Sequence, residues 1–141
     1  MKKTSAFLIG CAIICAVLFI LLWQFKLGRE EIPPAFTLMD YKVSSTDGNV
    51  INLIILNTIG TKVTLNSVKV MFSGSTCSYS VGSDLRVGQS MSITIPKSGE
   101  CSDITLPNQG ERFQADITFN YTNINSGLTH LSTAECHGGV E

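Results

Sequence analysis

Hydrophobic and polar residues alternate along three segments of the chain. Apolar side chains occupy every second position of the longest segment, residues 112–121: Phe113, Ala115, Ile117, Phe119 and Tyr121. The same alternation covers residues 90–95 and 68–73. Because successive side chains of a strand point to opposite faces, this period of two predicts β-strands with one buried and one solvated face.

A change of parity predicts an irregularity within one of these strands. Val63 and Leu65 lie on the opposite parity from Val68, so both sets can face one core only if an extra residue intervenes. We therefore expect a bulge or kink near Asn66-Ser67.

Turn signals connect further strands. Asp47-Gly48 predicts a hairpin after a strand at residues 36–43, and residues 123–127 predict a turn into a strand at residues 128–135. With about seven short strands and no helical period after residue 27, the pattern predicts an immunoglobulin-like antiparallel β-sandwich.

One strand, residues 50–56, is apolar on both faces except at Asn52. A strand with a single covered face should alternate. Either another part of the chain covers the second face, or a neighbouring molecule does. Under the second alternative Ile54 and Leu56 are the candidate interface residues.

A second kind of pattern lies near the start of the chain. Residues 6–23 contain no charged side chain and no Asn, Gln, Ser, Thr or Pro. As an α-helix this segment would be about 27 Å long, close to the hydrocarbon thickness of a bilayer. Trp23 and Lys26 suit a membrane interface, so we expect a transmembrane helix over residues 6–27. Lys2 and Lys3 favour an inside N-terminus and an outside domain.

A cleaved signal peptide and a lipoprotein are the two alternatives to an uncleaved anchor. A signal peptide has an h-region of roughly 7–15 residues and a small-x-small cleavage site, whereas this segment is longer and ends without Ala-x-Ala. The tetrapeptide Leu8-Ile9-Gly10-Cys11 resembles a lipobox, but too few apolar residues precede it. Lipid attachment at Cys11 is therefore the lesser alternative.

These patterns divide the chain into four parts. A basic N-terminus (residues 1–5) precedes the helix (6–27), a stalk (28–34) ends in Ile32-Pro33-Pro34, and the β-domain follows (35–141). The β-domain contains six Lys/Arg and nine Asp/Glu without a basic stripe. We therefore expect no nucleic acid as a partner. The predicted helix makes the membrane an expected partner.

Three cysteines lie in the β-domain. Outside the cell two of them would normally form a disulfide. Cys77 and Cys101 flank the strand at residues 90–95, so a bridge between them would fasten that part of the chain to the sandwich. We predict this pairing, which leaves Cys136 over.

The leftover thiol stands near the two histidines of the chain, His130 and His137. A blue-copper site needs two His and one Cys with converging side chains, but adjacent strand residues face opposite sides. A covalent haem motif lacks its first cysteine, because Thr133 stands at that position. We expect no metal and no cofactor, and keep a site of His130, Cys136 and His137 as the alternative.

Motifs for hydrolysis or phosphate binding are not found in the sequence, and we expect no enzyme and no small-molecule substrate. Asn120-Tyr121-Thr122 is an acceptor sequence for N-glycosylation. By alternation Asn120 lies on the solvated face of its strand, where an oligosaccharide could be accommodated.

Several short motifs resemble a known family. LNTIGTKVTL at residues 56–65 is similar to a strand–turn–strand of archaeal type IV pilin-like and archaellum stator-like ectodomains. Residues 117–122, 126–130 and 138–141 are similar to the ending of small archaeal pilin-like proteins. The resemblance implies a single-pass cell-surface protein with an immunoglobulin-like ectodomain, often with a cysteine pair at the positions of Cys77 and Cys101. Its partners would be other copies or envelope or pilus proteins.

The N-terminus departs from that family, because Thr4-Ser5-Ala6-Phe7 follows the basic pair and no acidic residue precedes Glu30. This departure favours an accessory or minor member. We therefore expect a non-enzymatic structural or adhesion subunit that assembles or docks through its β-domain. The alternative is a membrane-tethered binding or redox module that uses Cys136 with His130 or His137.

Overall fold

The computed structural model describes residues 14–17, 20 and 34–141. The basic N-terminus and nearly all of the predicted transmembrane helix lie outside these residues. Among the residues that are described, no helix is long and apolar enough to span a membrane. The chain divides into two compact units, residues 1–33 and 34–141, and the second unit is the β-domain.

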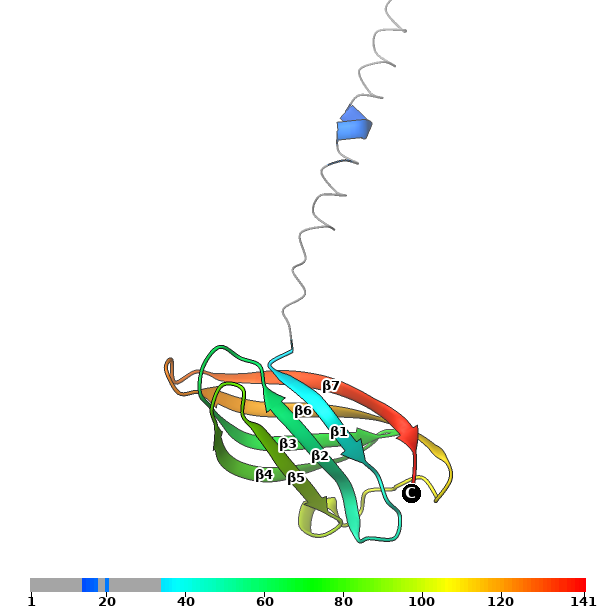
Figure 1. Cartoon of the computed structure of the whole chain (residues 1–141). Coiled ribbons are helices and arrows are strands. Elements are labelled where there is room, and N and C mark those ends of the chain that lie inside the picture. Colours follow the sequence, from blue (N-terminus) through cyan, green and yellow to red (C-terminus); the bar gives the residue numbers. More distant parts are fainter. Residues whose placement is uncertain (1–13, 18–19, 21–33) are drawn as a thin grey trace, which may run out of the picture. The chain divides into compact units, whose positions relative to one another are not determined.

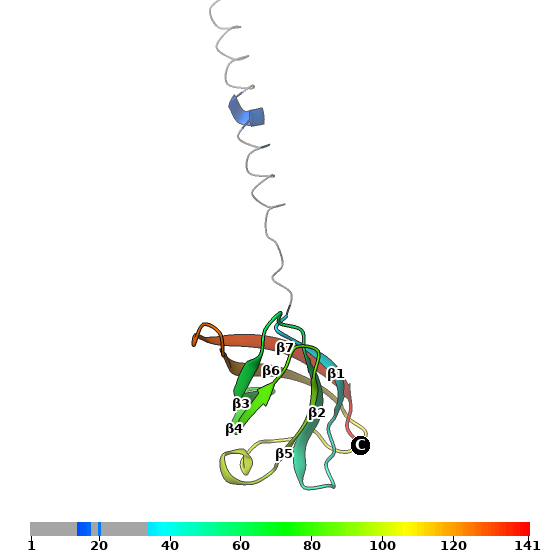
Figure 2. The same cartoon turned by 60° about the vertical axis from the view of Figure 1, so that its left-hand side comes forward.

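Seven strands form two antiparallel sheets that face each other (Figures 1 and 2). The three-stranded sheet has the order β1 (Phe36–Lys42), β2 (Asn49–Asn57), β5 (Ser90–Pro96). The four-stranded sheet has the order β4 (Ser75–Leu85), β3 (Val63–Phe72), β6 (Arg112–Asn123), β7 (Thr129–Gly139). A 3₁₀ turn, η1 (Gly99–Cys101), interrupts the connection from β5 to β6.

The prediction of a mainly β fold with about seven strands in an antiparallel sandwich is confirmed. The position of β4 differs from the constant-type immunoglobulin arrangement, in which the fourth strand joins the sheet of the first, second and fifth. Here β4 pairs with β3 instead. The tight turn at Ser73-Gly74 explains this, because a two-residue connection joins neighbours of one sheet.

The core lies between the two sheets and contains the apolar residues of the alternating segments. Phe113, Ala115, Ile117 and Phe119 of β6 are all buried, as their parity predicts. The ring of Phe36 on β1 packs on Phe119, with 5.2 Å between ring centroids. Burial of such side chains contributes about 1.5–3 kcal/mol each and is the main force holding the sheets together.

The irregularity expected near Asn66-Ser67 is confirmed. The register of β3 shifts between Leu65 and Ser67 against both β4 and β6. The shift allows Val63, Leu65 and Val68 to be buried together despite their opposite parities.

Two strands differ from the expectation. The pattern did not indicate β4, and β7 continues to Gly139 instead of ending near residue 135. Both are edge strands of their sheet. Only Cys77 and Leu85 are fully buried on β4, so this strand has no long apolar alternation by which it could have been detected.

The two ends of the sandwich differ in what they contain. The chain arrives at one end, where the Thr58 hydroxyl donates a 3.0 Å hydrogen bond to the carbonyl of Pro34. We call this the proximal end; it comprises residues 34–35 and the connections 58–62, 86–89 and 124–128. The C-terminus lies at the opposite, distal end (Figure 1), where the N–H of Glu141 donates to the carbonyl of Val43 over 3.0 Å.

Candidate functional site

The predicted disulfide is confirmed. Cys77 of β4 is bonded to Cys101 of η1, with 4.9 Å between their Cα atoms, and both are buried. Since η1 lies in the long connection from β5 to β6, the bridge fastens this connection to the edge of the four-stranded sheet. Its role is structural.

Cys136 is a free thiol whose side chain lies in the core. It pairs with Ala115 across β6 and β7, and its surroundings are apolar. Burial, followed by the nearby carboxylates of Asp116 and Glu135, raises the pKa of this thiol to about 11. A protonated, buried thiol is neither a good nucleophile nor a ready metal ligand.

The two histidines do not join Cys136 in a site. His130 is six residues away along β7, about 20 Å in an extended strand, and its ring stacks on Tyr121 at 5.5 Å. His137 is next to Cys136 and so faces the opposite side of the sheet, opposite Gln114. In the part of the chain that the structure describes, no group of three His, Cys, Asp or Glu could hold a metal.

The apolar run at residues 50–56 shows how β2 uses its two faces. Ile51, Leu53 and Ile55 are buried between the sheets. Val50 is also buried, because the register against β5 shifts between Asn49 and Ile51. Ile54 is 38% exposed on the outer face.

The outer face around Ile54 carries a small apolar patch. Leu56, two residues further, is half-buried, and Met39, which is 58% exposed, is the extra residue of a β1 bulge opposite Ile54. We call Met39, Ile54 and Leu56 the outer-face patch. Asp40 and Ser92 are the cross-strand neighbours of Ile54, so the patch has a polar border.

The glycosylation sequence lies on the outer face of the four-stranded sheet. The side-chain amide of Asn66 donates hydrogen bonds of 3.0 Å to Asn120 Oδ1 and to Thr122 Oγ1. Thr122 also contacts Thr129 of β7 at 3.1 Å. The Asn120 Nδ2, the atom that a glycan would modify, is therefore not used in this network.

Asn57 ties the connections of the proximal end together from inside. Its side chain is buried, with Nδ2 donating to the carbonyls of Thr61 and Leu85 over 3.1 Å each. Its Oδ1 accepts a 2.9 Å hydrogen bond from the N–H of Ile59. The Asn of the family-like motif at residues 56–65 thus has a structural explanation, since it fixes the turn that follows β2.

A second side-chain amide, that of Asn125, links the β6–β7 turn to the turn that follows β2. Asn125 Nδ2 donates a 2.7 Å hydrogen bond to Thr61 Oγ1, and the N–H of Ile124 donates to the carbonyl of Lys62 over 3.2 Å. The three connections of the proximal end therefore form one hydrogen-bonded unit.

Large apolar side chains project from this unit into solvent. Val87 is 56% exposed, Ile124 43% and Leu128 60%. Turns normally carry Gly, Asn, Asp or Ser, so apolar residues at their tips are unusual. The sequence pattern did not identify this surface; the signal for it was the occurrence of Val, Ile and Leu within turn segments.

The proximal end carries three charged side chains: Lys62, Asp84 and Arg86. Lys62 forms a 2.7 Å ion pair with Asp84, whose pKa is lowered by hydrogen bonds from Lys62 and then from the hydroxyl of Thr64. Arg86 is free of an ion pair among the described residues. A surface depression of about 680 Å³ lies here. It is lined by Lys62, Asp84, Arg86, Val87, Gly88 and Gln89.

The three cysteines of the β-domain are thus buried, and the described surface offers apolar and polar side chains for contact. Comparison with protein-family models and with curated proteins finds no match to this chain.

Proposed function

We propose that this protein is a non-enzymatic structural or adhesion subunit of the cell surface, anchored by residues 6–27 and docking through an immunoglobulin-like β-domain. The pilin-like resemblance of residues 56–65 supports the setting. The observation that carries the proposal is the outer-face patch, because Ile54 and Met39 keep apolar surface exposed on a face whose other side chains are mainly polar or charged, such as Asp40, Asn52 and Ser92. Exposed apolar patches on a folded domain mark contact surfaces.

The alternative of a redox or metal module has less support. It requires Cys136 to meet a histidine, but the thiol is buried, His130 lies about 20 Å away along the strand, and His137 faces the other side. The carboxylates of Asp116 and Glu135 are exposed on the outer face of the sheet, whereas the thiol points into the core, so the three groups do not form one site.

A charge placed on the outer-face patch tests the proposal. In the full-length protein in native membranes, Ile54→Lys should abolish chemical cross-linking to other copies or to envelope proteins. Met71→Lys is the matched control, because Met71 has the same exposure of 38% but lies on the outer face of the other sheet. Cross-links should persist in this control.

Two results would count against the proposal. If the wild-type protein forms no cross-links at all, there is no assembly to disrupt. If Ile54→Lys and Met71→Lys have equal effects, the patch has no special role. Thermal unfolding of both variants shows whether a loss of cross-links reflects a loss of fold.

A further inference from the structure

We propose that the proximal end of the β-domain lies directly on the lipid surface, with Val87, Ile124 and Leu128 at the boundary between headgroups and acyl chains and Arg86 next to anionic headgroups. The proposal rests on membrane anchoring by residues 6–27, which belongs to the proposed function. It adds a second membrane contact, made by the folded domain itself.

The length of the connecting chain favours lipid as the occupant. Residues 28–33 join the predicted anchor to Pro34, and an extended residue spans at most about 3.6 Å, so the connection reaches no further than about 25 Å. Pro34 itself is held at the proximal end by the hydrogen bond from Thr58. An anchor in the bilayer therefore keeps this end of the domain close to the surface.

The exposed apolar side chains lie where such a contact would need them. Val87 belongs to the connection 86–89, and Ile124 and Leu128 to the connection 124–128, both at the proximal end. Apolar side chains next to cationic ones are typical of elements that lie in the interfacial region of a bilayer.

The backbone beneath them is held in place. Asn57 connects the β2–β3 turn to the end of β4, and Asn125 connects the β6–β7 turn to Thr61. The N–H of Gly88 also donates to the carbonyl of Asn57 over 2.9 Å. The apolar tips are thus presented by one preorganised platform, which lowers the entropy cost of docking.

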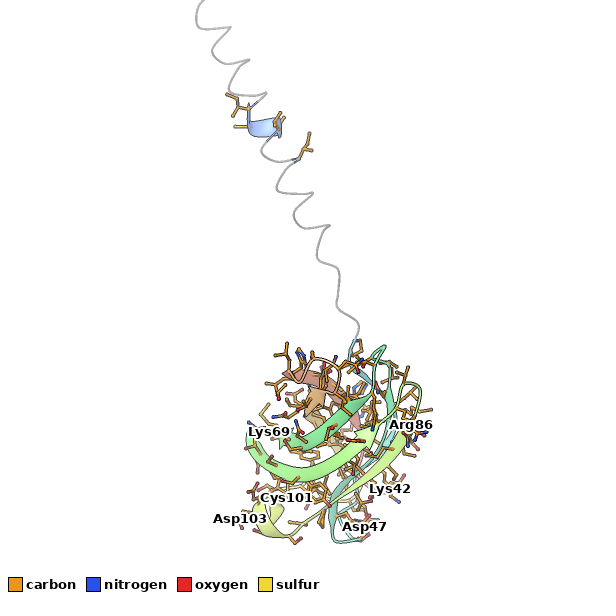
Figure 3. All side chains as sticks on the ribbon, turned by 90° about the vertical axis from the view of Figure 1, so that its left-hand side faces the viewer. Lys42, Asp47, Lys69, Arg86, Cys101 and Asp103 are labelled. Atoms are coloured by element: carbon orange, nitrogen blue, oxygen red, sulfur yellow. A yellow bond between two sulfur atoms is a disulfide. The ribbon has the colours of Figure 1, made fainter. Side chains whose placement is uncertain are left out.

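The distribution of charge orients the domain in the same sense. Asp84 is the single acidic residue of the proximal connections and their strand ends, and it is paired with Lys62, which leaves the positive charge of Arg86. The distal end is net negative: it carries five of the acidic residues of the domain, Asp47, Glu100, Asp103, Glu111 and Glu141, against the three basic residues Lys42, Lys97 and Arg112, of which Lys42 is paired with Glu141. Figure 3 shows Arg86 far from Asp47 and Asp103. An anionic lipid surface attracts the first group and repels the second.

Tryptophan fluorescence can test the contact, because Trp23 is the only tryptophan of the chain. Full-length protein is reconstituted into anionic vesicles that contain brominated phospholipids, which quench tryptophan on contact. In a Trp23→Phe background, Leu128→Trp should be quenched and its emission shifted to the blue. The matched control is Asp103→Trp at the distal end, which should be quenched several-fold less.

Adding Arg86→Gln to the Leu128→Trp variant should reduce quenching in anionic vesicles and leave it unchanged in zwitterionic ones. Val87→Trp replaces Leu128→Trp if circular dichroism shows that the latter fails to fold. Equal quenching of the proximal and distal tryptophans would overturn the proposal.

The unmodified protein separates this proposal from the one on which it rests. If Trp23 is quenched but tryptophan at position 128 is not, the anchor stands and the surface contact is wrong. If Trp23 is not quenched, the anchor itself fails. A blue shift at position 128 without quenching would show that a protein, such as a second copy, covers the proximal end, and would overturn the lipid contact.

Discussion

The side-chain amide of Asn57 donates a 3.1 Å hydrogen bond to the carbonyl of Leu85, at the end of the strand that belongs to the other sheet. The two residues are 28 positions apart and both are buried. Because an unpaired buried carbonyl is costly, this bond fixes how the two sheets meet at the proximal end.

Asn57→Ala should lower the free energy of unfolding by about 2–4 kcal/mol, because it leaves the carbonyl of Leu85 and the N–H of Ile59 without partners. Urea denaturation measures the loss. The matched control is Asn125→Ala, an exposed amide of the same end, whose bond water can replace, so its loss should be about 1 kcal/mol or less. Equal losses would show that Asn57 has no special role.

Replacing both Cys77 and Cys101 by Ala should destabilise the domain by about 3–4 kcal/mol, the value expected from chain entropy for a bridge between residues 24 positions apart. The measurement is denaturant unfolding with and without a reductant. Reduction should lower the stability of the wild type to that of the double variant and leave the variant unchanged. A reductant effect on the variant would contradict this explanation.

Cys136 should resist alkylation by iodoacetamide in the native protein and react once denaturant is added. With a pKa of about 11, only about one thiol in a thousand is ionised at pH 8, and its side chain is out of contact with the reagent. Peptide mapping by mass spectrometry separates Cys136 from Cys11 and Cys15. Rapid labelling of native Cys136 would show that β7 opens readily.

The ion pair of Lys62 and Asp84 should support stability at neutral pH and lose its effect in acid. The pKa of Asp84 is lowered below 3.8 by Lys62 and Thr64, so its contribution is complete above that value and disappears as the pH falls through the lowered pKa. Asp84→Asn should therefore be less stable than the wild type at pH 7, with the difference vanishing once the pH has fallen below the lowered pKa of Asp84. Thermal unfolding across pH measures this.

Added salt provides a check on the same pair. The two side chains are half-exposed, so high salt should shrink the difference between Asp84→Asn and the wild type. A difference that persists in acid or in high salt would point to the hydrogen bond from Thr64 as its source.

The strands that bury one face could be predicted, because burial on one side imposes a period of two. Phe113 to Phe119 and the parity change before Val68 show this directly, down to the bulge. The edge strand β4 could not be predicted, since its partners and its disulfide, and not a row of large apolar groups, hold it in place.

The candidate surfaces were predictable only in part. Ile54 was indicated because a second apolar face on β2 lacked an obvious cover, and the structure leaves it 38% exposed. The proximal platform depends on hydrogen bonds between residues far apart in sequence, such as Asn125 and Thr61, which no local pattern encodes. The burial of Cys136 follows from its parity on a strand whose end lay beyond the predicted one.

The arrival of the chain at one end of β1 has a mechanical consequence. A pull on Pro34 away from the domain, in line with β1, acts along this strand, whose hydrogen bonds to β2 run across the direction of force from Phe36 to Lys42. Such a load is shared by the whole ladder at once, whereas a sideways pull would open the bonds one after another. A pull along β1 is thus the load that the first strand resists best.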